Sequence, residues 1–336
     1  MLLIITNEED IHPNPVIDQL VKLNVPFFRL NTESLLSHYD ITYAISNASH
    51  SFTIKYKDGS HAISSHDISS VWERRPIEPL TTFDDLEPNV SKLVLEEGDG
   101  FLRYFRYSLT HVPWIGHAVN ERKAGSKILQ KVVAKSLGMK IPSTIFTNEL
   151  NAIKEFPHNQ IAIKPIYAHV LEKSAEETYV FYTSLQDKSK LVGLGESGIR
   201  NTMNFIEAYV EKDFEVRATV VVDEIFSVSI NSQSFDKSKG KIDWRQGYDH
   251  GIQFTAMDLP QEISEKCFQF LEYFELSFGC FDFIVDKNGD YHFLECNTNG
   301  QWVWIEEEAS LPISTKLAAS FEKYYLDKKA NECIHR

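Results

Sequence analysis

Three oxygen-bearing side chains near the C-terminal end of the chain have the types and spacing of a cation site: Asp282, Glu295 and Asn297. They fall in two runs of β-branched and aromatic residues around a Lys-Asn-Gly turn, which predicts a β-hairpin. Side chains two apart on a strand share a face, and a four-residue loop at 287–290 would place Asp282 opposite Glu295. Two carboxylates and an amide oxygen suit a hard cation such as Mg²⁺ that also binds phosphates. A solvated hairpin face is the alternative, because such a triplet is not specific by itself.

Three basic side chains on separate predicted elements could face the same anion. Lys127 lies in a helix, Lys164 ends a strand, and Arg217 lies on a later strand. Two lysines and an arginine from different elements can neutralise a polyphosphate from several sides. Each also has an ordinary interpretation, with Lys127 as a solvated helix lysine and Arg217 as the partner of Glu215 or Asp213. Lys164 is flanked by apolar residues, so it needs a partner wherever it is buried.

The motifs that the sequence lacks narrow the chemistry further. It contains neither a G-x-x-x-x-G-K-[ST] loop nor a G-x-G-x-x-G turn, so side chains and a hairpin would have to hold the phosphates. It contains no Ser-His-Asp order and no H-E-x-x-H motif. The basic and acidic groups that remain are most consistent with phosphoryl transfer to a carboxylate.

The composition is that of a globular chain of 336 residues, 43% hydrophobic and 24% charged, which is enough for two or three subdomains. The net charge of −14 argues against nucleic acid as a partner of the chain as a whole. No run of about 18 apolar residues is present, so we expect no membrane span. The four cysteines include no C-x-x-C pair, and the N-terminus lacks a basic stretch before its short apolar run. We therefore expect free thiols and a cytoplasmic location.

The first part of the chain predicts a small α/β subdomain. The expected elements are strands at 2–6, 26–30, 41–46, 51–57 and 68–72 and helices at 14–23 and 89–109. A Pro-Trp-Ile-Gly run after the second helix breaks the pattern. We place the end of this subdomain there, so that it covers residues 1–115.

Two further subdomains are expected, a central one at 116–206 and a C-terminal one at 207–326, followed by a loose tail at 327–336. The central elements are a helix at 120–137, with apolar residues 128, 129, 132 and 133 on one face, and strands at 142–147, 160–165, 179–184 and 190–194. The C-terminal elements are strands at 216–222 and 225–230, the hairpin, and helices at 262–274 and 313–325.

This order of elements resembles that of the ATP-grasp ligases over essentially the whole chain. The resemblance implies an α/β (α+β) class, namely an ATP-grasp fold with three subdomains that holds ATP between two mainly antiparallel sheets. The implied cofactors are ATP and Mg²⁺, with two ions expected. The implied roles are phosphate binding by Lys127 and Lys164, nucleotide contacts by Glu207, Ala208, Tyr209, Val210 and Glu215, γ-phosphate or acyl-phosphate contact by Arg217, and metal binding by Asp282, Glu295 and Asn297. Ala208 stands where a glutamate is frequent, so only backbone contacts to adenine are expected from that position.

Two stretches resemble signatures of the graspetide (microviridin-type) peptide macrocyclases. Residues 72–76 match W-x-R-R-P and residues 297–304 match N-x-N-G-Q-W-x-W, and the runs at 117–120 and 141–144 are similar to runs in the same subfamily. The simpler glutamate ligases usually have E-x-N without the two tryptophans that follow it here. The resemblance therefore implies substrate contacts by Arg74, Arg75, Trp302 and Trp304.

The implied reaction is ATP-dependent phosphorylation of a Glu or Asp carboxyl in a ribosomal precursor peptide, followed by attack of a Ser or Thr hydroxyl or a Lys amine of that peptide. The product is a macrocyclic ester or amide. The implied partners are a precursor with leader and core segments, bound around 179–184 and the helix that follows, and a second copy of the chain in a homodimer. A D/E-x-R pair is expected near the acceptor, and 215–217 and 243–245 both fit. We assign Arg217 to the phosphate and Arg245, with Asp243, to the substrate carboxylate, a division that the sequence leaves open.

Two other functions fit parts of the pattern. One is an ATP-dependent ligase that joins an amino acid to a protein or small-molecule carboxylate. The other, from a different class, is a non-catalytic ATP-binding module, which is disfavoured because the three metal-ligand positions and both lysines occur together. Only the tryptophan-containing tail, through its resemblance, separates the macrocyclase from the amino-acid ligase.

Overall fold

The chain begins with a parallel sheet built on its most apolar run. The structure is a computed structural model that describes residues 1–80, 86–167, 170–174, 177–232 and 253–334. All five side chains of the first strand, β1 (Leu2–Thr6), are buried, and the strand lies inside a sheet of order β2-β1-β6-β7. Because a parallel strand is covered on both faces, its sequence is continuously apolar instead of alternating.

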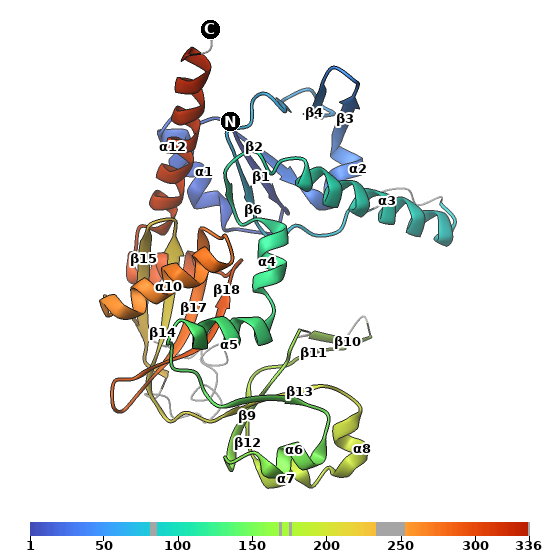
Figure 1. Ribbon diagram of the computed structural model, residues 1–336. Helices are drawn as coiled ribbons and strands as arrows, with labels where there is room; N and C mark the ends of the chain where they lie inside the picture. Colours follow the sequence, from blue (N-terminus) through green and yellow to red (C-terminus); the bar gives the residue numbers. More distant parts are fainter. Residues whose placement is uncertain (81–85, 168–169, 175–176, 233–252, 335–336) are drawn as a thin grey trace.

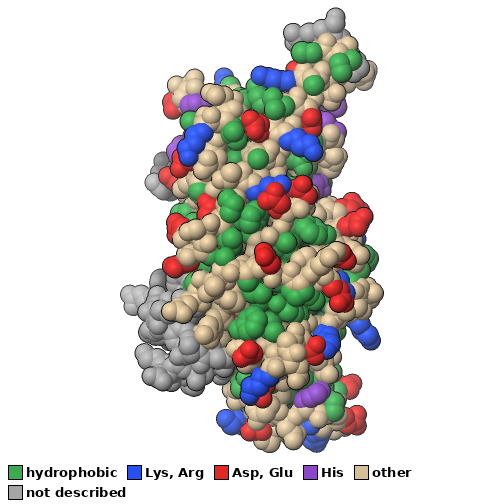
Figure 2. Space-filling view, turned by 90° about the vertical axis from the view of Figure 1, so that its left-hand side faces the viewer, with side chains coloured by type: hydrophobic (Ala, Val, Ile, Leu, Met, Phe, Trp, Pro, Cys, Tyr) green, Lys and Arg blue, Asp and Glu red, His purple; other side chains and the backbone are tan. Residues whose placement is uncertain are grey.

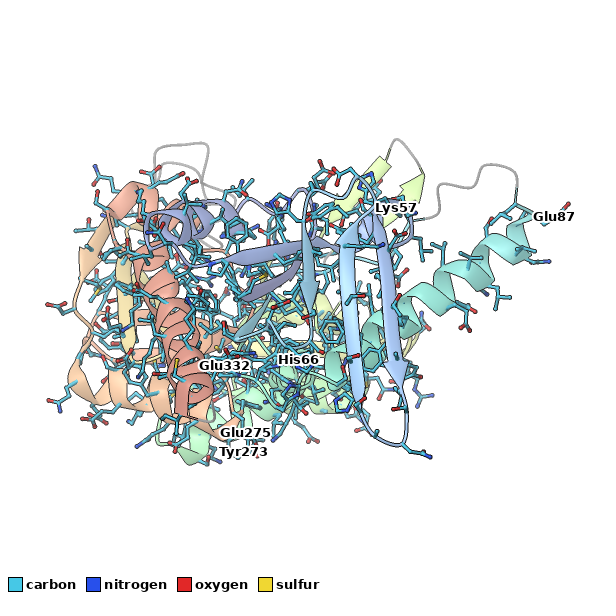
Figure 3. The ribbon with its side chains drawn as sticks, turned by 90° about the horizontal axis from the view of Figure 1, so that it is seen from above. Lys57, His66, Glu87, Tyr273, Glu275 and Glu332 are labelled. Carbon is cyan, nitrogen blue, oxygen red and sulfur yellow. The ribbon has the colours of Figure 1, made fainter. Side chains whose placement is uncertain are left out.

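The N-terminal subdomain adds an antiparallel sheet, β3-β4-β5, and a projecting helix to this parallel sheet. Its elements are β1 (Leu2–Thr6), α1 (Pro13–Lys22), β2 (Phe27–Asn31), η1 (Thr32–Ser34), α2 (Leu35–His38), β3 (Tyr39–Ile45), β4 (His50–Tyr56), β5 (Ala62–Ser64), β6 (Ser70–Glu73), α3 (Pro88–Tyr107) and β7 (Trp114–Ile115). Figure 3 shows α3 extending away from the body of the molecule, with its N-cap residue Glu87 at the outer tip.

The central elements form a separate antiparallel sheet of order β12-β9-β13-β8 beside a two-stranded hairpin. They are α4 (Ala118–Ala124), α5 (Lys127–Ser136), β8 (Thr144–Thr147), α6 (Leu150–Glu155), β9 (Gln160–Lys164), β10 (Val170–Ser174), β11 (Glu177–Val180), β12 (Ser184–Asp187), α7 (Lys188–Val192), α8 (Gly195–Arg200) and β13 (Asn204–Ala208). The predicted boundary at 206/207 falls inside β13, so this sheet gives way to the next one only after Ala208.

The C-terminal subdomain is organised around an antiparallel sheet of order β16-β15-β14-β17-β18. Its elements are β14 (Lys212–Val221), β15 (Glu224–Ile230), β16 (Phe254–Met257), α10 (Gln261–Tyr273), β17 (Phe278–Asp286), β18 (Tyr291–Asn297), α11 (Val303–Ala309) and α12 (Ile313–Ile334). The predicted hairpin is β17–β18, and its register pairs Asp282 with Glu295 as expected. One core cluster joins this sheet to the N-terminal subdomain through Trp72, Trp302 and Phe321.

Figure 1 shows how these parts are arranged. The central sheet lies at the bottom, the C-terminal sheet above it to the left, and the N-terminal subdomain above it to the right. The helix α12 packs against α1 and runs up to the C-terminus. Among the described residues, no helix combines the length and the apolar character needed to cross a bilayer. On the face drawn in Figure 2, a band of hydrophobic side chains crosses the middle, and acidic and basic side chains are interspersed around it.

The helix predicted at 120–137 is wrong in two respects. It is interrupted, because α4 ends at Ala124 and α5 begins at Lys127 after the N-cap Ser126, whose side chain accepts a hydrogen bond from the Leu129 N–H at 3.3 Å. Its predicted apolar face is also only half right, since residue 133 is buried and residue 129 packs against a core cluster, but residues 128 and 132 are exposed. The buried side chains of α5 instead include Gln130 and Lys131, because this face meets the backbone of β18 and the carboxylate of a residue on β13.

Three further local predictions are wrong. Residues 179–184 do not form one strand, because β11 ends at Val180 and β12 begins at Ser184. Residues 190–194 are not a strand, because 188–192 form α7, which begins after Asp187 and ends at Gly193. The tail at 327–336 is not loose over its described part, because α12 continues to Ile334. Lys328 on this helix donates hydrogen bonds to the carbonyl oxygens of His66 and Ile68, so the N-terminal subdomain holds the helix in place. Figure 3 labels His66 and Glu332 at this junction.

Candidate functional site

A cleft of about 930 Å³ lies between the central and the C-terminal sheets. Both sheets contribute polar side chains to its walls, and the loop after β6 contributes one more. The site residues predicted from the sequence that line it are Arg75, Lys127, Lys164, Glu207, Ala208, Tyr209, Val210, Glu215, Arg217, Asp282, Glu295, Asn297 and Trp304. The fold therefore brings residues that are up to 229 positions apart in the chain, Arg75 and Trp304, to the same space.

The oxygen-bearing triplet converges on the floor of this cleft. Asn297 Nδ2 lies 3.0 Å from Asp282 Oδ2 and 3.3 Å from Glu295 Oε1. The ladder produces this contact, because β17 pairs Asp282 with Glu295 across the hairpin, and Asn297 lies two residues further on the same face of β18.

The donor set of this triplet fits a hard cation. Among the described residues, no group of three His, Cys, Asp or Glu side chains is arranged to hold a metal, so a third protein ligand here has to be the amide of Asn297. Two carboxylates and an amide oxygen are ligands that Mg²⁺ accepts, and the open cleft leaves room for water and phosphate oxygens. Rotation of the side-chain amide exchanges its nitrogen and its oxygen, so the oxygen of Asn297 can face a cation in this position.

Basic side chains hold both carboxylates of the triplet. Arg217 Nη1 donates to Asp282 Oδ2 at 2.8 Å, and its Nη2 donates to the carbonyl oxygen of Gln301 at 3.1 Å. Burial alone would lower the pKa of Arg217, but the carboxylate of Asp282 outweighs burial and raises it. Lys127, the first residue of α5, forms an ion pair with Glu295. The two predicted phosphate-binding groups therefore lie directly beside the predicted metal ligands.

The third predicted basic group, Lys164, pairs with a residue of the predicted adenine linker. Its Nζ lies 2.5 Å from Glu207 Oε2, and the other oxygen of this carboxylate lies 2.5 Å from Lys131 Nζ. Sequence reasoning missed Lys131, which is buried and lies outside the residues that line the cleft. A usable signal was its spacing, since a residue four positions after Lys127 lies on the same face of a helix.

Two backbone N–H groups of the predicted adenine linker form hydrogen bonds with neighbouring parts of the chain. The N–H of Ala208 donates to the carbonyl oxygen of Ser143 at 2.8 Å, and the N–H of Tyr209 donates to that of Gln160 at 3.0 Å. These two donors are therefore used within the protein. Val210, which also lines the cleft, is the linker residue that we propose as the backbone donor to an adenine ring.

Glu215 lies on β14 at the cleft wall and forms an ion pair with Lys212 at 2.7 Å, where both side chains are buried. The sequence also suggested Arg217 as a partner of Glu215, but Arg217 is bound to Asp282 instead. Arg217 and Glu215 are two apart on β14 and share a face, so both can serve the same ligand.

The two signature stretches meet at one joint. Arg74 is buried, and its Nη1 donates to the carbonyl oxygen of Gly300 at 2.9 Å, while its Nε lies 3.4 Å from Asp10 Oδ2. Gly300 is required by close approach, because a Cβ there would lie 2.6 Å from the Cβ of Cys280 and 2.7 Å from Arg217 Nη2. Arg74 therefore supports the loop after β18 and does not line the cleft.

Trp302 and Trp304 also differ in their surroundings. Trp302 is fully buried in the core shared with the N-terminal subdomain, and its ring lies 5.4 Å from that of His12. Trp304 lines the cleft and packs on Phe254, with their ring centroids 4.8 Å apart. Of the four predicted substrate contacts, the structure thus places Arg75 and Trp304 in the cleft, and Arg74 and Trp302 behind it.

One part of the prediction lies outside the described residues, and another part lies at the edge of the cleft. Asp243 and Arg245, the predicted acceptor pair, fall within 233–252, which the structure does not describe. The stretch at 179–184, predicted to bind a leader peptide, contains exposed aromatic side chains, namely Tyr179, Phe181 and Tyr182. Tyr182 also lines the cleft, so this stretch lies at its edge.

Two acidic side chains, Glu73 and Glu121, lie behind the joint. Glu121 Oε2 accepts a hydrogen bond from Asn299 Nδ2 at 3.2 Å, and Glu73 Oε1 accepts one from Arg106 Nη1 at 2.9 Å. Burial raises the pKa of Glu73 to about 7. Burial, with the nearby charge of Glu73, raises the pKa of Glu121 to about 8. Each carboxyl thus holds its proton more tightly in the folded chain than at its ordinary value of 4.5.

We expect Glu121→Gln to stabilise the protein more at pH 8.5 than at pH 5.5. A carboxyl whose folded pKa is raised gives a contribution to stability that is fully present below pH 4.5 and is lost as pH rises through its folded pKa. Glutamine has no proton to lose, so the melting temperature of the variant relative to wild type should rise by about 2 °C or more between these pH values. Melting curves at both pH values measure this difference. Glu97→Gln, an exposed site on α3, is the control, and equal differences at both pH values would contradict the assignment.

Comparison with known proteins agrees with this fold. A family model described as MvdD pre-ATP grasp domain matches residues 1–122. A search of the curated proteins found no match. Among solved structures, a RiPP-associated ATP-grasp ligase of Chryseobacterium gregarium, in complex with ADP and a leader and core peptide, superposes with a TM-score of 0.88 at 24% identity, over 95% of this chain and 96% of that one.

Two other solved structures are similar over nearly their whole length. Macrocyclase MdnC of Microcystis aeruginosa MRC, bound with precursor peptide MdnA, has a TM-score of 0.81 at 26% identity, over 95% of this chain and 98% of that one. ATP-grasp ligase PsnB, complexed with minimal precursor, Mg and ADP, has a TM-score of 0.73 at 15% identity, over 96% and 97%. The predicted ATP-grasp fold is confirmed, and residues 1–122 match the model of the MvdD pre-ATP grasp domain.

Proposed function

We propose that this protein is an ATP-dependent peptide macrocyclase that activates Glu or Asp side-chain carboxyls of a precursor peptide and joins them to Ser, Thr or Lys side chains. The main observation behind the proposal is the convergence of Lys127, Lys164 and Arg217 with the Asp282, Glu295 and Asn297 triplet in one cleft. The similar solved structures that hold precursor peptides and nucleotide support the same assignment.

Each residue of the cleft has a role in the proposed first step. Lys127 and Lys164 bind the phosphates of ATP, and Arg217 orients the γ-phosphoryl group beside the substrate carboxylate. Asp282, Glu295 and Asn297 would hold Mg²⁺, which would neutralise the negative charge of the phosphate oxygens. A carboxylate oxygen of the peptide attacks the γ-phosphorus, and ADP leaves, which converts a poor electrophile into an acyl phosphate.

The second step closes the ring. A hydroxyl or amine of the same peptide attacks the acyl carbon and loses its proton, and inorganic phosphate leaves. Arg217 stabilises the negative charge that develops in both steps, because it is fixed in place before the reaction by Asp282 and the carbonyl oxygen of Gln301. The net change in the peptide is the loss of one water for each ring.

Intact mass spectrometry tests this proposal directly. The protein is incubated with ATP, Mg²⁺ and a candidate precursor peptide, for which the first choice is a short peptide encoded next to its gene with clustered Thr or Ser and Glu or Asp. We expect the peptide to lose the mass of one water per ring, and omission of ATP is the control. A gain equal to an added amino acid would favour an amino-acid ligase instead. ATP binding without turnover would favour a non-catalytic module.

Arg75 is the side chain that we propose as a contact for the anionic peptide. Its backbone has a positive φ of 43°, which is uncommon for a residue other than glycine, and its carbonyl oxygen accepts a hydrogen bond from Asn7 Nδ2 at 2.7 Å. That conformation turns the exposed Arg75 into the cleft while Arg74 points into the core. Adjacent arginines therefore serve different purposes.

We expect Arg75→Ala to raise the KM for the peptide about tenfold and to leave the KM for ATP within about twofold, because the lost contact is one partly exposed charge. Initial rates at varied peptide and varied ATP measure the two constants. Arg103→Ala, an exposed site on α3, is the control. An equal rise in both constants would argue against a contact with the peptide alone.

The homodimer stays a prediction that rests on the resemblance to the family, and the cytoplasmic location stays one that rests on the cysteine pattern and the N-terminal sequence. Sedimentation equilibrium of the full chain measures the first, and we expect twice the mass of 38.6 kDa. The proposed three-subdomain division likewise rests on the separation of the three main sheets.

A further inference from the structure

One carboxylate on the wall of the cleft, that of Glu207 on β13, is shared by two lysines. Its Oε1 lies 2.5 Å from Lys131 Nζ on α5, and its Oε2 lies 2.5 Å from Lys164 Nζ on β9. The side chains of Glu207, Lys131 and Lys164 are 1%, 7% and 17% exposed. Water therefore has little access to the acid, and the more accessible lysine is the one that lines the cleft.

The charges of this triad matter for any anion that enters the cleft. One carboxylate with one lysine is a neutral pair, which offers a phosphate no net attraction. Two lysines on the same carboxylate leave a net charge of +1. In a place with little water, that difference of one charge is felt strongly, because the interaction of charges grows as the local dielectric falls.

We propose that Lys131 is a positioning residue for the nucleotide, because it neutralises Glu207 and so lets Lys164 turn from that carboxylate to a phosphate of ATP. The inference rests on the proposed function, in which the cleft binds ATP. Lys131 does not itself line the cleft. Its effect on nucleotide binding is therefore indirect and depends on the change of partner at Lys164.

The surroundings of Lys131 suit a fixed partner for Glu207. Its Nζ also donates a hydrogen bond to the carbonyl oxygen of Phe293 at 3.2 Å and lies 5.6 Å from the centre of that ring. It is thus held from two sides, by β13 and by β18. Burial lowers the pKa of Lys131 to about 8, although Glu207 opposes that shift, so the ammonium form is retained at neutral pH.

Lys164 has the opposite character. It ends β9 at the cleft, and its Nζ lies 5.9 Å from the centre of the Phe205 ring. A lysine side chain has four rotatable bonds and can change partner with little movement of the backbone. Loss of Lys164 from Glu207 is tolerable only if another cation stays on the carboxylate, since a buried unpaired carboxylate is strongly unfavourable.

Direct nucleotide binding tests this inference without any peptide. Isothermal titration calorimetry of the full chain with Mg²⁺ and a non-hydrolysable ATP analogue gives the Kd. We expect Lys131→Met to weaken binding by about tenfold, because Glu207 then retains Lys164. The double variant Lys131→Met with Glu207→Gln should recover binding to within about threefold of wild type, since the neutral amide no longer retains the lysine. Lys135→Met, an exposed lysine one turn further along α5, is the control.

The possible outcomes separate this inference from the proposed function. If the wild type does not bind the nucleotide, the proposed function fails. If the wild type binds and Lys131→Met binds equally well, only the inference fails. If the double variant is as weak as the single one, Lys131 acts as a structural support and the inference is likewise overturned. Lys131→Gln provides a second measure should Lys131→Met not fold, and nucleotide binding at the wild-type affinity in that variant would also overturn the inference.

Discussion

Glu295→Gln is expected to lower ring formation by at least a hundredfold while leaving the protein folded. The change removes one of the two carboxylate charges in the proposed cation site but keeps the shape of the side chain. Loss of a single group that stabilises developing charge in a closed site commonly costs on the order of a hundredfold to a thousandfold in kcat. The described contacts of Glu295, an ion pair with Lys127 and a hydrogen bond from Asn297, make it central to the floor of the cleft.

The effect on stability should be much smaller than the effect on the reaction. The side chains of Lys127 and Glu295 are 14% and 26% exposed, so water screens part of their attraction. Glutamine can still accept a hydrogen bond from Asn297. We therefore expect the melting temperature to stay within a few degrees of wild type.

Single-turnover assays by mass spectrometry, together with melting curves, measure the two effects. Glu272→Gln, an exposed site on α10, is the matched control and should behave as wild type in both. Ring formation by Glu295→Gln at the wild-type rate would remove Glu295 from the proposed site. A collapse of the melting curve would instead assign it a structural role.

Arg217→Lys is expected to lower kcat by about a hundredfold and to change the Kd for the nucleotide by less than tenfold. Lysine keeps the positive charge but cannot reproduce the planar fork that spans Asp282 and the carbonyl oxygen of Gln301. The charge still attracts phosphate, but it is no longer fixed where charge develops. The expected loss is therefore mainly in kcat.

Arg217→Ala should behave differently, because it leaves Asp282 without its arginine in a place that is only 17% exposed. Breaking a buried pair by removing one partner costs about 3–5 kcal/mol, so this variant should be clearly less stable than Arg217→Lys. Calorimetry gives the Kd, and steady-state rates give kcat. Arg200→Lys is the control, because Arg200 forms an exposed ion pair with Glu196 on α8. A wild-type kcat in Arg217→Lys would contradict the proposed role.

Much of the candidate site could be predicted because it depends on local periodicity. The hairpin residues alternate, and Asp282 pairs with Glu295 as predicted, but the loop length alone does not produce this pair. The rungs nearer the turn pair Val285 with Tyr291, and a register shift between Asp282 and Phe283 brings Asp282 opposite Glu295. The strand that ends in Lys164 and the strand that carries Arg217 are also found where the sequence indicates them. In each of these cases, a short segment contains both the residue and the element that orients it.

For α5, the helix that carries Lys127, the local sequence pattern does not predict which face is buried. Its apolar spacing suggested a buried face containing Ile128 and Val132, yet both are more than half exposed. The face that is buried carries Gln130 and Lys131, which bond to the backbone of Cys296 and to Glu207. Polar side chains are buried there because their partners come from β13 and β18, and no property of the helix alone reports those partners.

The sequence by itself determined which groups are present and which share a strand face: the acidic triplet, the basic residues on separate elements, and the two signature stretches at 72–76 and 297–304. Only the tertiary structure decided how neighbours divide their tasks. Arg74 and Arg75 are adjacent, but a left-handed backbone at Arg75 sends one side chain to the carbonyl oxygen of Gly300 and the other into the cleft. The physical reason is that such a choice depends on burial and on hydrogen-bond partners more than 200 residues away, which pattern and propensity do not encode.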